Sequence, residues 1–305
     1  MEEKMSKNYT KLLIAALLAA LVITGLLAGC AKPVESSGEK PPKDSDITAP
    51  DSGVIKGSED EIIDTAKDTI SIAVDREPAS LDPVIYVTNW NSQDQIYEGL
   101  VKYELDGSIS PCLAESFEQV DDVTWKFKLR EDVYFHNGEH MTSADVLYSF
   151  KRAMSYPQAA AVLSNLDPES FEAPDDYTFI LKTKTPYAFI LQNLCETYLS
   201  ITNQKAVEDA GSPEKFGRSP VGTGAYKFVS WTAGDRITLT KFDEYWGEQA
   251  KVQNVVVKII TEATTRTIDL ESGGSDINWV VASEDYERIA NGDKTNVLMY
   301  TAGSY

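Results

Sequence analysis

Two histidines and a glutamate have the spacing of zinc ligands, and they are the residues most suggestive of chemistry. His136, Glu139 and His140 match H-x-x-E-H, a pattern of zinc-dependent hydrolases whose two histidines must share one face of a helix. Asn137-Gly138 lies between them, and this dipeptide favours a tight turn over a helix. The chain has no other histidine, so a third ligand would have to be a carboxylate or a cysteine. We therefore expect polar residues on a hairpin loop and no metal, and we keep a secreted metal-dependent hydrolase using His136 and His140 as the alternative.

Other catalytic groupings are weaker still. The chain has no G-x-S-x-G turn, and neither Cys112 nor Cys195 has a recognisable basic neighbourhood. Gly222-Thr-Gly224 is too short for a phosphate loop and lacks the Walker lysine. No pair of carboxylates stands out for glycoside hydrolysis. We expect no enzyme, no catalytic residue and no cofactor. Cys112 and Cys195 could pair in an oxidising compartment, but two separate buried thiols is the preferred interpretation.

The third cysteine, Cys30, indicates a different chemistry. Lysines precede an apolar run over residues 12–27, which is typical of a secretory signal peptide and shorter than the ~18–20 apolar residues of a membrane span. Leu27-Ala-Gly-Cys30 resembles the bacterial lipobox. That resemblance implies removal of residues 1–29, a lipid on Cys30 and anchoring at the extracytoplasmic face of the cell membrane. A signal anchor with a chance cysteine is the alternative.

Composition limits the partners. The formal net charge of −20 disfavours nucleic acid, because like charges repel, and 42% hydrophobic residues supply material for a core. Residues 30–66, from the cysteine onward, are rich in proline, serine, glycine and charged side chains, without apolar periodicity. Such a segment cannot bury enough apolar surface to fold, so we expect a disordered tether.

The elements that would position any site alternate between strands and helices. The patterns predict strands over 69–74, 225–231, 236–241, 252–260 and 276–281, and helices over 92–100 and 263–271. The nearly continuous β-branched run at 252–260 is typical of a strand covered on both faces. Strand–helix–strand order implies an α/β layer.

Between these segments lies an antiparallel section. Residues 124–130 alternate, with Trp125, Phe127 and Leu129 on one face and basic residues on the other. Thr142-Ser-Ala-Asp145 predicts a capping box that opens a helix through about Met154. A strand at 177–182 and a helix near 189–194 follow.

One long block of sequence resembles a known family. Residues 113–152, from Leu-Ala-Glu-Ser-Phe to Tyr-Ser-Phe-Lys-Arg, are similar to the signature of the family 5 extracellular solute-binding proteins, the receptors of peptide and nickel ABC transporters. Glu77-Pro-Ala-Ser-Leu-Asp-Pro83, Ile96-Tyr-Glu-Gly-Leu100 and the segment from Gly222 to Trp246 agree with it. The similarity covers about Thr69 to Tyr305.

The resemblance implies an α/β, type II periplasmic-binding-protein fold, whose two lobes close on a ligand. Domain I would comprise 67–100 and 196–285, with an antiparallel-sheet domain II inserted at 101–195. Residues 286–305 would begin the crossover to the opposite lobe. Family members are considerably longer, so we expect a truncated fold, an N-terminal fragment without that lobe.

The resemblance also implies candidate ligand contacts. Val87, Thr88, Asn89 and Trp90 map to an extended segment that pairs with a peptide as an added strand would, although Trp90 could equally be a core aromatic. Thr223 maps to a hinge-side contact. We expect a monomer that passes oligopeptides to an ABC permease, and nickel, haem and oligosaccharide stay open as alternative ligands.

Overall fold

The computed structural model describes residues 67–85, 91–295 and 297, and every structural statement below concerns these residues. The predicted signal peptide, Cys30, the tether and the segment Val87–Trp90 lie outside them. Within them, no helix is both long enough and apolar enough to cross a bilayer.

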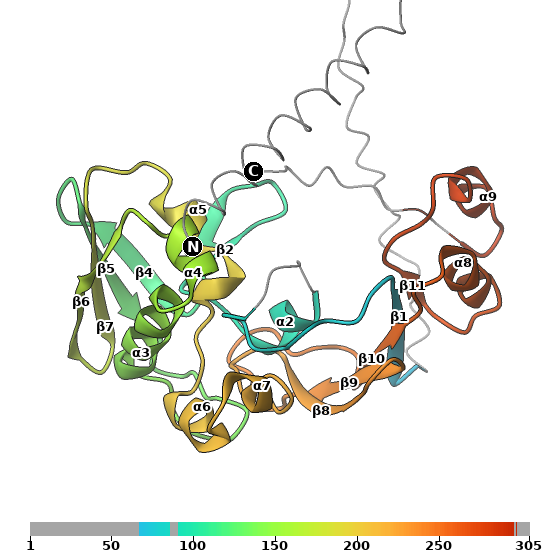
Figure 1. Cartoon of the computed structure of the whole chain (residues 1–305), viewed down its shortest axis with the longest axis horizontal. Coiled ribbons are helices and arrows are strands. Elements are labelled where there is room, and N and C mark those ends of the chain that lie inside the picture. The colour runs from blue at the N-terminus through green and yellow to red at the C-terminus, as the bar shows by residue number, and fades with distance from the viewer. Residues whose placement is uncertain (1–66, 86–90, 296, 298–305) are drawn as a thin grey trace, which may run out of the picture. The chain divides into compact units, whose positions relative to one another are not determined.

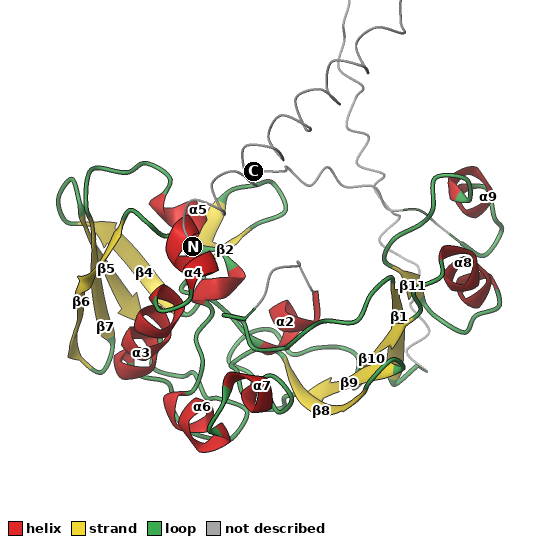
Figure 2. Ribbon diagram, in the orientation of Figure 1, coloured by secondary structure: helices red, strands yellow, loops and turns green. Residues whose placement is uncertain are grey.

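A five-stranded mixed sheet contains both early and late segments of the chain (Figures 1 and 2). In spatial order its strands are β11 (Ile277–Asn278), β1 (Thr69–Val74), β10 (Asn254–Ile259), β9 (Arg236–Lys241) and β8 (Tyr226–Thr232). β1 runs parallel to β10 and β11, whereas β9 is antiparallel to β8 and β10. Helix α8 (Ala263–Glu271) connects β10 to β11, so the predicted α/β layer is confirmed.

The burial of β10 differs from the prediction. Val255, Val257 and Ile259 are buried, whereas the alternate residues Val256 and Lys258 are partly exposed. The strand is confirmed, but the prediction that both of its faces are covered is wrong for the described part of the chain. A β-branched run favours an extended backbone, while its coverage depends on distant segments that pack against it.

A second sheet of four antiparallel strands holds the other core. Its order is β4 (Ala114–Gln119), β5 (Thr124–Leu129), β7 (Thr178–Thr183) and β6 (Leu166–Asp175). A separate hairpin pairs β2 (Val101–Tyr103) with β3 (Ile109–Pro111). The predicted alternation of β5 is confirmed: Phe127 and Leu129 are fully buried, whereas Lys126 and Lys128 are exposed.

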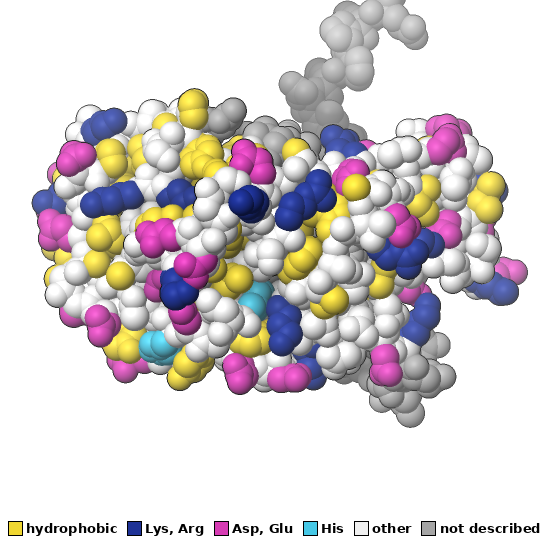
Figure 3. All heavy atoms as spheres, turned by 60° about the horizontal axis from the view of Figure 1, so that its bottom comes forward, with side chains coloured by type: hydrophobic (Ala, Val, Ile, Leu, Met, Phe, Trp, Pro, Cys, Tyr) yellow, Lys and Arg dark blue, Asp and Glu magenta, His cyan; other side chains and the backbone are white. Residues whose placement is uncertain are grey.

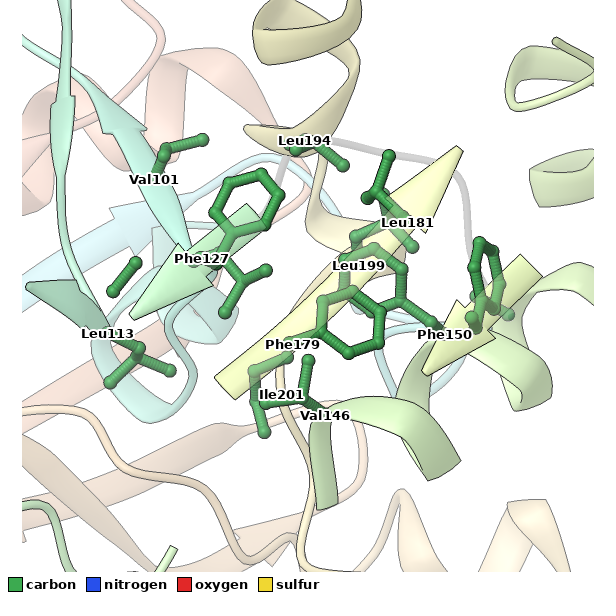
Figure 4. Close-up of a cluster of buried hydrophobic side chains, with 14 of the residues drawn as sticks. Val101, Leu113, Phe127, Val146, Phe150, Phe179, Leu181, Leu194, Leu199 and Ile201 are labelled. Carbon is green, nitrogen blue, oxygen red and sulfur yellow. The ribbon is translucent and has the colours of Figure 1, made fainter. Parts of the chain in front are cut away.

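Helix α3 (Ser143–Met154) covers this sheet. The Asp145 carboxylate accepts hydrogen bonds from the backbone N–H and the hydroxyl of Thr142 at 3.1 and 3.2 Å, which confirms the capping box. Val146 and Phe150 are fully buried, and the Phe150 ring meets Phe179 edge-on at 4.8 Å (Figure 4). These contacts join the helix and the sheet in one core.

The other helices are short. They are α2 (Asn91–Ile96), α4 (Pro157–Val162), α5 (Ile190–Leu194), the 3₁₀ turn η1 (Thr197–Leu199), α6 (Gln204–Ala210), α7 (Pro213–Phe216) and α9 (Tyr286–Ala290). α2 ends at Ile96 and not at Leu100 as predicted, because Gly224 N–H donates to the Ile96 carbonyl at 2.9 Å in place of a helical donor. The division into domains I and II at the stated residues stays a prediction.

Candidate functional site

An apolar recess of about 710 Å³ lies between one face of the five-stranded sheet and α2. The sheet supplies aliphatic side chains, among them Ile72, Val74, Leu239, Val255 and Val257. Ser92, Asp94 and Gln95 of α2 supply the polar groups on the other side. A concave, mostly apolar surface with a few convergent polar groups is the usual form of a small-molecule site.

The recess reaches the carboxyl edge of the parallel strands. Asp75 and Arg76 follow β1 directly, and Trp279 and Val280 follow β11; all four residues line the recess. Trp279 is 45% exposed and Val280 is 41% exposed. Open α/β sheets bind ligands outside the carboxyl ends of their strands, so this edge is where the fold favours a ligand.

Asp94 gives the recess an unusually weak carboxylic acid. The residue is exposed, yet desolvation by the surrounding protein raises the pKa of its carboxyl group to about 6. The group therefore changes charge close to neutral pH, where an ordinary aspartate would be fully ionised.

Beside α2, Glu98 connects several distant segments. Its carboxylate accepts hydrogen bonds from the Thr223 hydroxyl, the Tyr245 hydroxyl and the Trp246 indole N–H at 2.8–2.9 Å, and a longer one from the Cys112 thiol. We call these five side chains the Glu98 cluster. Desolvation by burial raises the pKa of Glu98, while the four donors oppose that rise.

Thr223 is therefore engaged by the protein itself. It has no exposed surface, and its hydroxyl donates to Glu98 at 2.9 Å. The glycines on either side allow this packing: a Cβ on Gly222 or Gly224 would lie within 2.3 Å of a backbone oxygen of Ile96 or Gln95. Its predicted role as a ligand contact stays a prediction.

The two histidines form hydrogen bonds with backbone groups. His136 Nε2 lies 2.9 Å from the Gly224 carbonyl, and its Nδ1 accepts from Gly222 N–H at 3.4 Å. These partners fix the neutral tautomer with the proton on Nε2, and burial lowers the pKa of His136 to about 4. His140 Nε2 lies 2.8 Å from the Glu131 carbonyl.

The turn between the histidines follows the prediction. Gly138 has φ +83° and donates its N–H to the Phe135 carbonyl at 2.8 Å, as a tight turn requires. Among the described residues no three histidine, cysteine or acidic side chains are grouped to hold a metal ion. His136 therefore joins the hairpin to the segment 222–224, whereas His140 bonds to the Glu131 carbonyl.

The cysteines are separate. Cys112 and Cys195 are both free thiols, as predicted; Cys112 is buried as expected, whereas Cys195 is only partly buried. Desolvation raises the pKa of Cys195 to about 12 and that of Cys112 further, so both thiols stay protonated and poorly nucleophilic.

Comparison with known proteins decides the family. A model described as "Bacterial extracellular solute-binding proteins, family 5 Middle" matches residues 108–305. The chain belongs to the family 5 bacterial extracellular solute-binding proteins. The resemblance seen in the sequence is confirmed, and with it the type II periplasmic-binding-protein fold.

Individual members of family 5 agree with this assignment. The chain is 28% identical over 245 residues to the probable D,D-dipeptide-binding periplasmic protein DdpA of Escherichia coli K12, covering 77% of this chain and 47% of that protein. Helicobacter pylori DppA in complex with the peptide STSA superposes with a TM-score of 0.65 at 29% identity, over 74% of this chain and 49% of the other. A nickel ABC transporter protein from Bacillus halodurans gives a TM-score of 0.66 at 32% identity, over 74% and 46%.

The family 5 chain described here spans about half the length of these relatives. The relatives are binding and transport proteins, and the family is one of solute-binding proteins, in agreement with the expectation of a non-enzyme. Acidic and basic side chains are interspersed over one face of the molecule, so the net charge of −20 does not collect into a single acidic patch there (Figure 3).

Sequence reasoning missed most of the residues that line the recess. Asp94, Trp279 and Val280 lie in segments that were predicted only as helix and strand. Glu98 stands in the Ile96–Leu100 motif that carried the family resemblance, yet nothing in the sequence indicated its four donors. The signal that could have found Trp279 is its position at the end of a strand parallel to β1, which requires the topology.

Proposed function

We propose that this solute-binding protein captures oligopeptides outside the cytoplasm and passes them to an ABC permease. The observation that carries the proposal is the apolar recess at the carboxyl edge of β1 and β11 in a family 5 fold. The relatives named for dipeptide and peptide binding support this ligand class. The protein would bind without chemical turnover and act as a monomer. Light scattering coupled to size-exclusion chromatography measures the oligomeric state.

The backbone of Val87, Thr88, Asn89 and Trp90 is the proposed peptide-pairing segment. Ser92, two residues after Trp90 in the sequence, lines the recess. Main-chain pairing gives affinity that is independent of the peptide's side chains, which suits a receptor of broad specificity. Thr223 is the proposed additional contact.

The decisive experiment uses the complete protein and a pool of synthetic oligopeptides. Binding should raise the free energy of unfolding by ~2.7 kcal/mol at a hundredfold excess over the Kd. Asn89→Pro removes a backbone N–H and should weaken binding, whereas the matched Asn89→Ala keeps the N–H and should bind as the wild type does. Equal affinity of both variants would exclude backbone pairing at this residue.

Nickel is the competing ligand that a specific observation favours, because a nickel transporter protein is 32% identical to the chain. The same binding assay with nickel alone, or with haem or an oligosaccharide, separates these ligand classes from peptides. Tight binding of one of them without peptide binding would replace the proposal.

A lipid on Cys30 is the proposed membrane anchor. Metabolic labelling with palmitate should mark the wild type and leave Cys30→Ser unlabelled, with the variant released from the membrane fraction. Equal labelling of both forms would exclude Cys30 as the modified residue.

A further inference from the structure

The Glu98 cluster joins the two sheets of the protein. Cys112 follows β3 and lies next to β4 of the four-stranded sheet, whereas Thr223 and Tyr245 flank β8 and β9 of the five-stranded sheet. Arg130, which follows β5, extends the junction: its guanidinium lies 4.2 Å from the centre of the Trp246 ring, and its Nε donates to the Cys112 carbonyl at 2.8 Å. One carboxylate therefore collects hydrogen bonds from segments that flank both sheets.

The two oxygens of Glu98 have different partners. Oε2 accepts from the Thr223 hydroxyl and from the Trp246 indole, whose N–H can only donate. Oε1 accepts from the Tyr245 hydroxyl at 2.8 Å and from the Cys112 thiol at 3.7 Å, and both of these groups can also accept. A proton on Glu98 thus fits on Oε1, where the Tyr245 hydroxyl can rotate and become its acceptor; on Oε2 only the Thr223 hydroxyl could do the same, because the indole N–H cannot accept.

Among the residues that the structure describes, no cation bonds to the Glu98 carboxylate. The titratable and charged groups around it are Cys112, Tyr245, Arg130, Lys102 and, behind the segment 222–224, His136. Burial raises the pKa values of Cys112 and Tyr245, so both remain neutral donors, and Arg130 reaches the carboxylate only across the Trp246 ring. The ionised form of Glu98 therefore bears a desolvation cost that four neutral donors only partly offset.

We propose that Glu98 is the proton-binding residue of the junction between the two sheets, and that a proton on its Oε1 makes this junction more stable in mild acid. Burial raises the pKa of Glu98 in the folded protein above that of an unfolded glutamate. The stabilising contribution is therefore complete below the unfolded value and is lost as the pH rises through the folded value. An extracytoplasmic protein meets the pH of its surroundings, so this junction would respond directly to external acid.

The test compares the wild type with Glu98→Gln, which places an NH₂ donor opposite Tyr245 and so imitates the protonated acid. The free energy of unfolding of the full chain is measured in urea between about pH 4.5 and pH 7.5. The stability of the wild type relative to the variant should fall as the pH rises. A flat difference, or one that rises with pH, would overturn the proposal.

A spectroscopic readout separates proton binding from a merely structural role. On acidification, the infrared difference between the wild type and Glu98→Gln should contain the carbonyl band of one protonated carboxyl group, and the difference between the wild type and Glu196→Gln should lack a band at that frequency. Glu196 is the matched control because its half-buried carboxyl group also has a raised pKa. Loss of this band in Glu196→Gln, with retention in Glu98→Gln, would show that Glu196 and not Glu98 binds the proton, and would contradict the proposal.

Trp246→Phe keeps the proposal testable if Glu98→Gln does not fold. Phenylalanine retains an aromatic ring under Arg130 but removes the N–H that donates to Oε2. The loss of a donor disfavours the ionised form, so the pH midpoint of the infrared band should move upward. An unchanged midpoint would show that the indole N–H does not hold the Glu98 carboxylate.

Discussion

Arg152 of helix α3 and Asp82 of the loop after β1 form a buried, two-pronged ion pair. Nη1 of Arg152 lies 2.9 Å from Oδ1 of Asp82, and Nη2 bonds to Oδ2. The Asp82 side chain is 0% exposed and that of Arg152 is 8% exposed. The pair connects the helix over the four-stranded sheet to the loop leaving the five-stranded sheet, 70 residues away in sequence. This ion pair is a second connection between the two sheets, and it shares no residue with the Glu98 cluster.

Removing one partner of this pair should destabilise the protein strongly. In Asp82→Asn, Arg152 keeps its charge but loses its carboxylate, and an uncompensated buried charge costs about 3–5 kcal/mol. Urea unfolding measures the change. Arg288→Gln, which breaks exposed pairs with Glu271 and Asp285, should have little effect. Similar losses in the two variants would show that burial does not strengthen the Asp82–Arg152 pair.

Truncating Phe150 should open a cavity in the four-stranded core. The ring is fully buried, and its centre lies 5.7 Å from that of the Phe171 ring and 4.8 Å from that of the Phe179 ring. Phe150→Ala should therefore lower the free energy of unfolding by about 3–5 kcal/mol, as measured by denaturant titration. Lys151→Ala, one position along on the exposed side of the same helix, is the control. A loss below that of the control would mean that the helix does not pack as described.

His136 should make the protein less stable as the pH falls. Burial lowers its pKa to about 4 from the usual 6.5, so the unfolded chain binds the proton more readily. The stability that His136 contributes is complete above about pH 6.5 and is lost toward pH 4, by about 3 kcal/mol at most. In His136→Gln this component of the pH profile should be missing.

His140→Gln is the control for that profile, because it leaves His136 and its bonds to Gly222 and Gly224 in place. Thermal or urea unfolding at several pH values should give the wild-type slope for this control. A wild-type slope in His136→Gln would show that another group produces the dependence.

A side chain at Gly224 should disturb the junction between α2 and β8. A Cβ there would lie 2.3 Å from the Gln95 carbonyl oxygen, and this steric clash can be relieved only if the backbone moves. Gly224→Ala should therefore destabilise the protein by more than 1–2 kcal/mol, on the order expected for overpacking. Ser230→Ala, on the exposed side of β8, should leave stability nearly unchanged. Circular dichroism melts of the two variants compare them directly.

The sequence by itself determined the elements whose signals are local. The alternation of Trp125, Phe127 and Leu129, the capping box at Thr142 and the Asn137-Gly138 turn all depend on neighbours within a few residues, and the structure contains each of them. The family also followed from sequence, because the block at 113–152 keeps its residue types in order. Val87–Trp90 remain predictions, since they lie outside the described residues.

Tertiary structure decided which residues meet. Glu98 finds its donors at Thr223, Tyr245 and Trp246, up to 148 residues away, and Asp82 finds Arg152 across the two sheets. It also decided that α2 ends at Ile96, that β10 is well covered on one face only, and that Trp279 and Asp94 border the same recess. These are properties of strand order and packing between distant segments. A hydrophobic pattern records how a segment alternates, but not which segment it lies against, and so the site could be seen only in the folded chain.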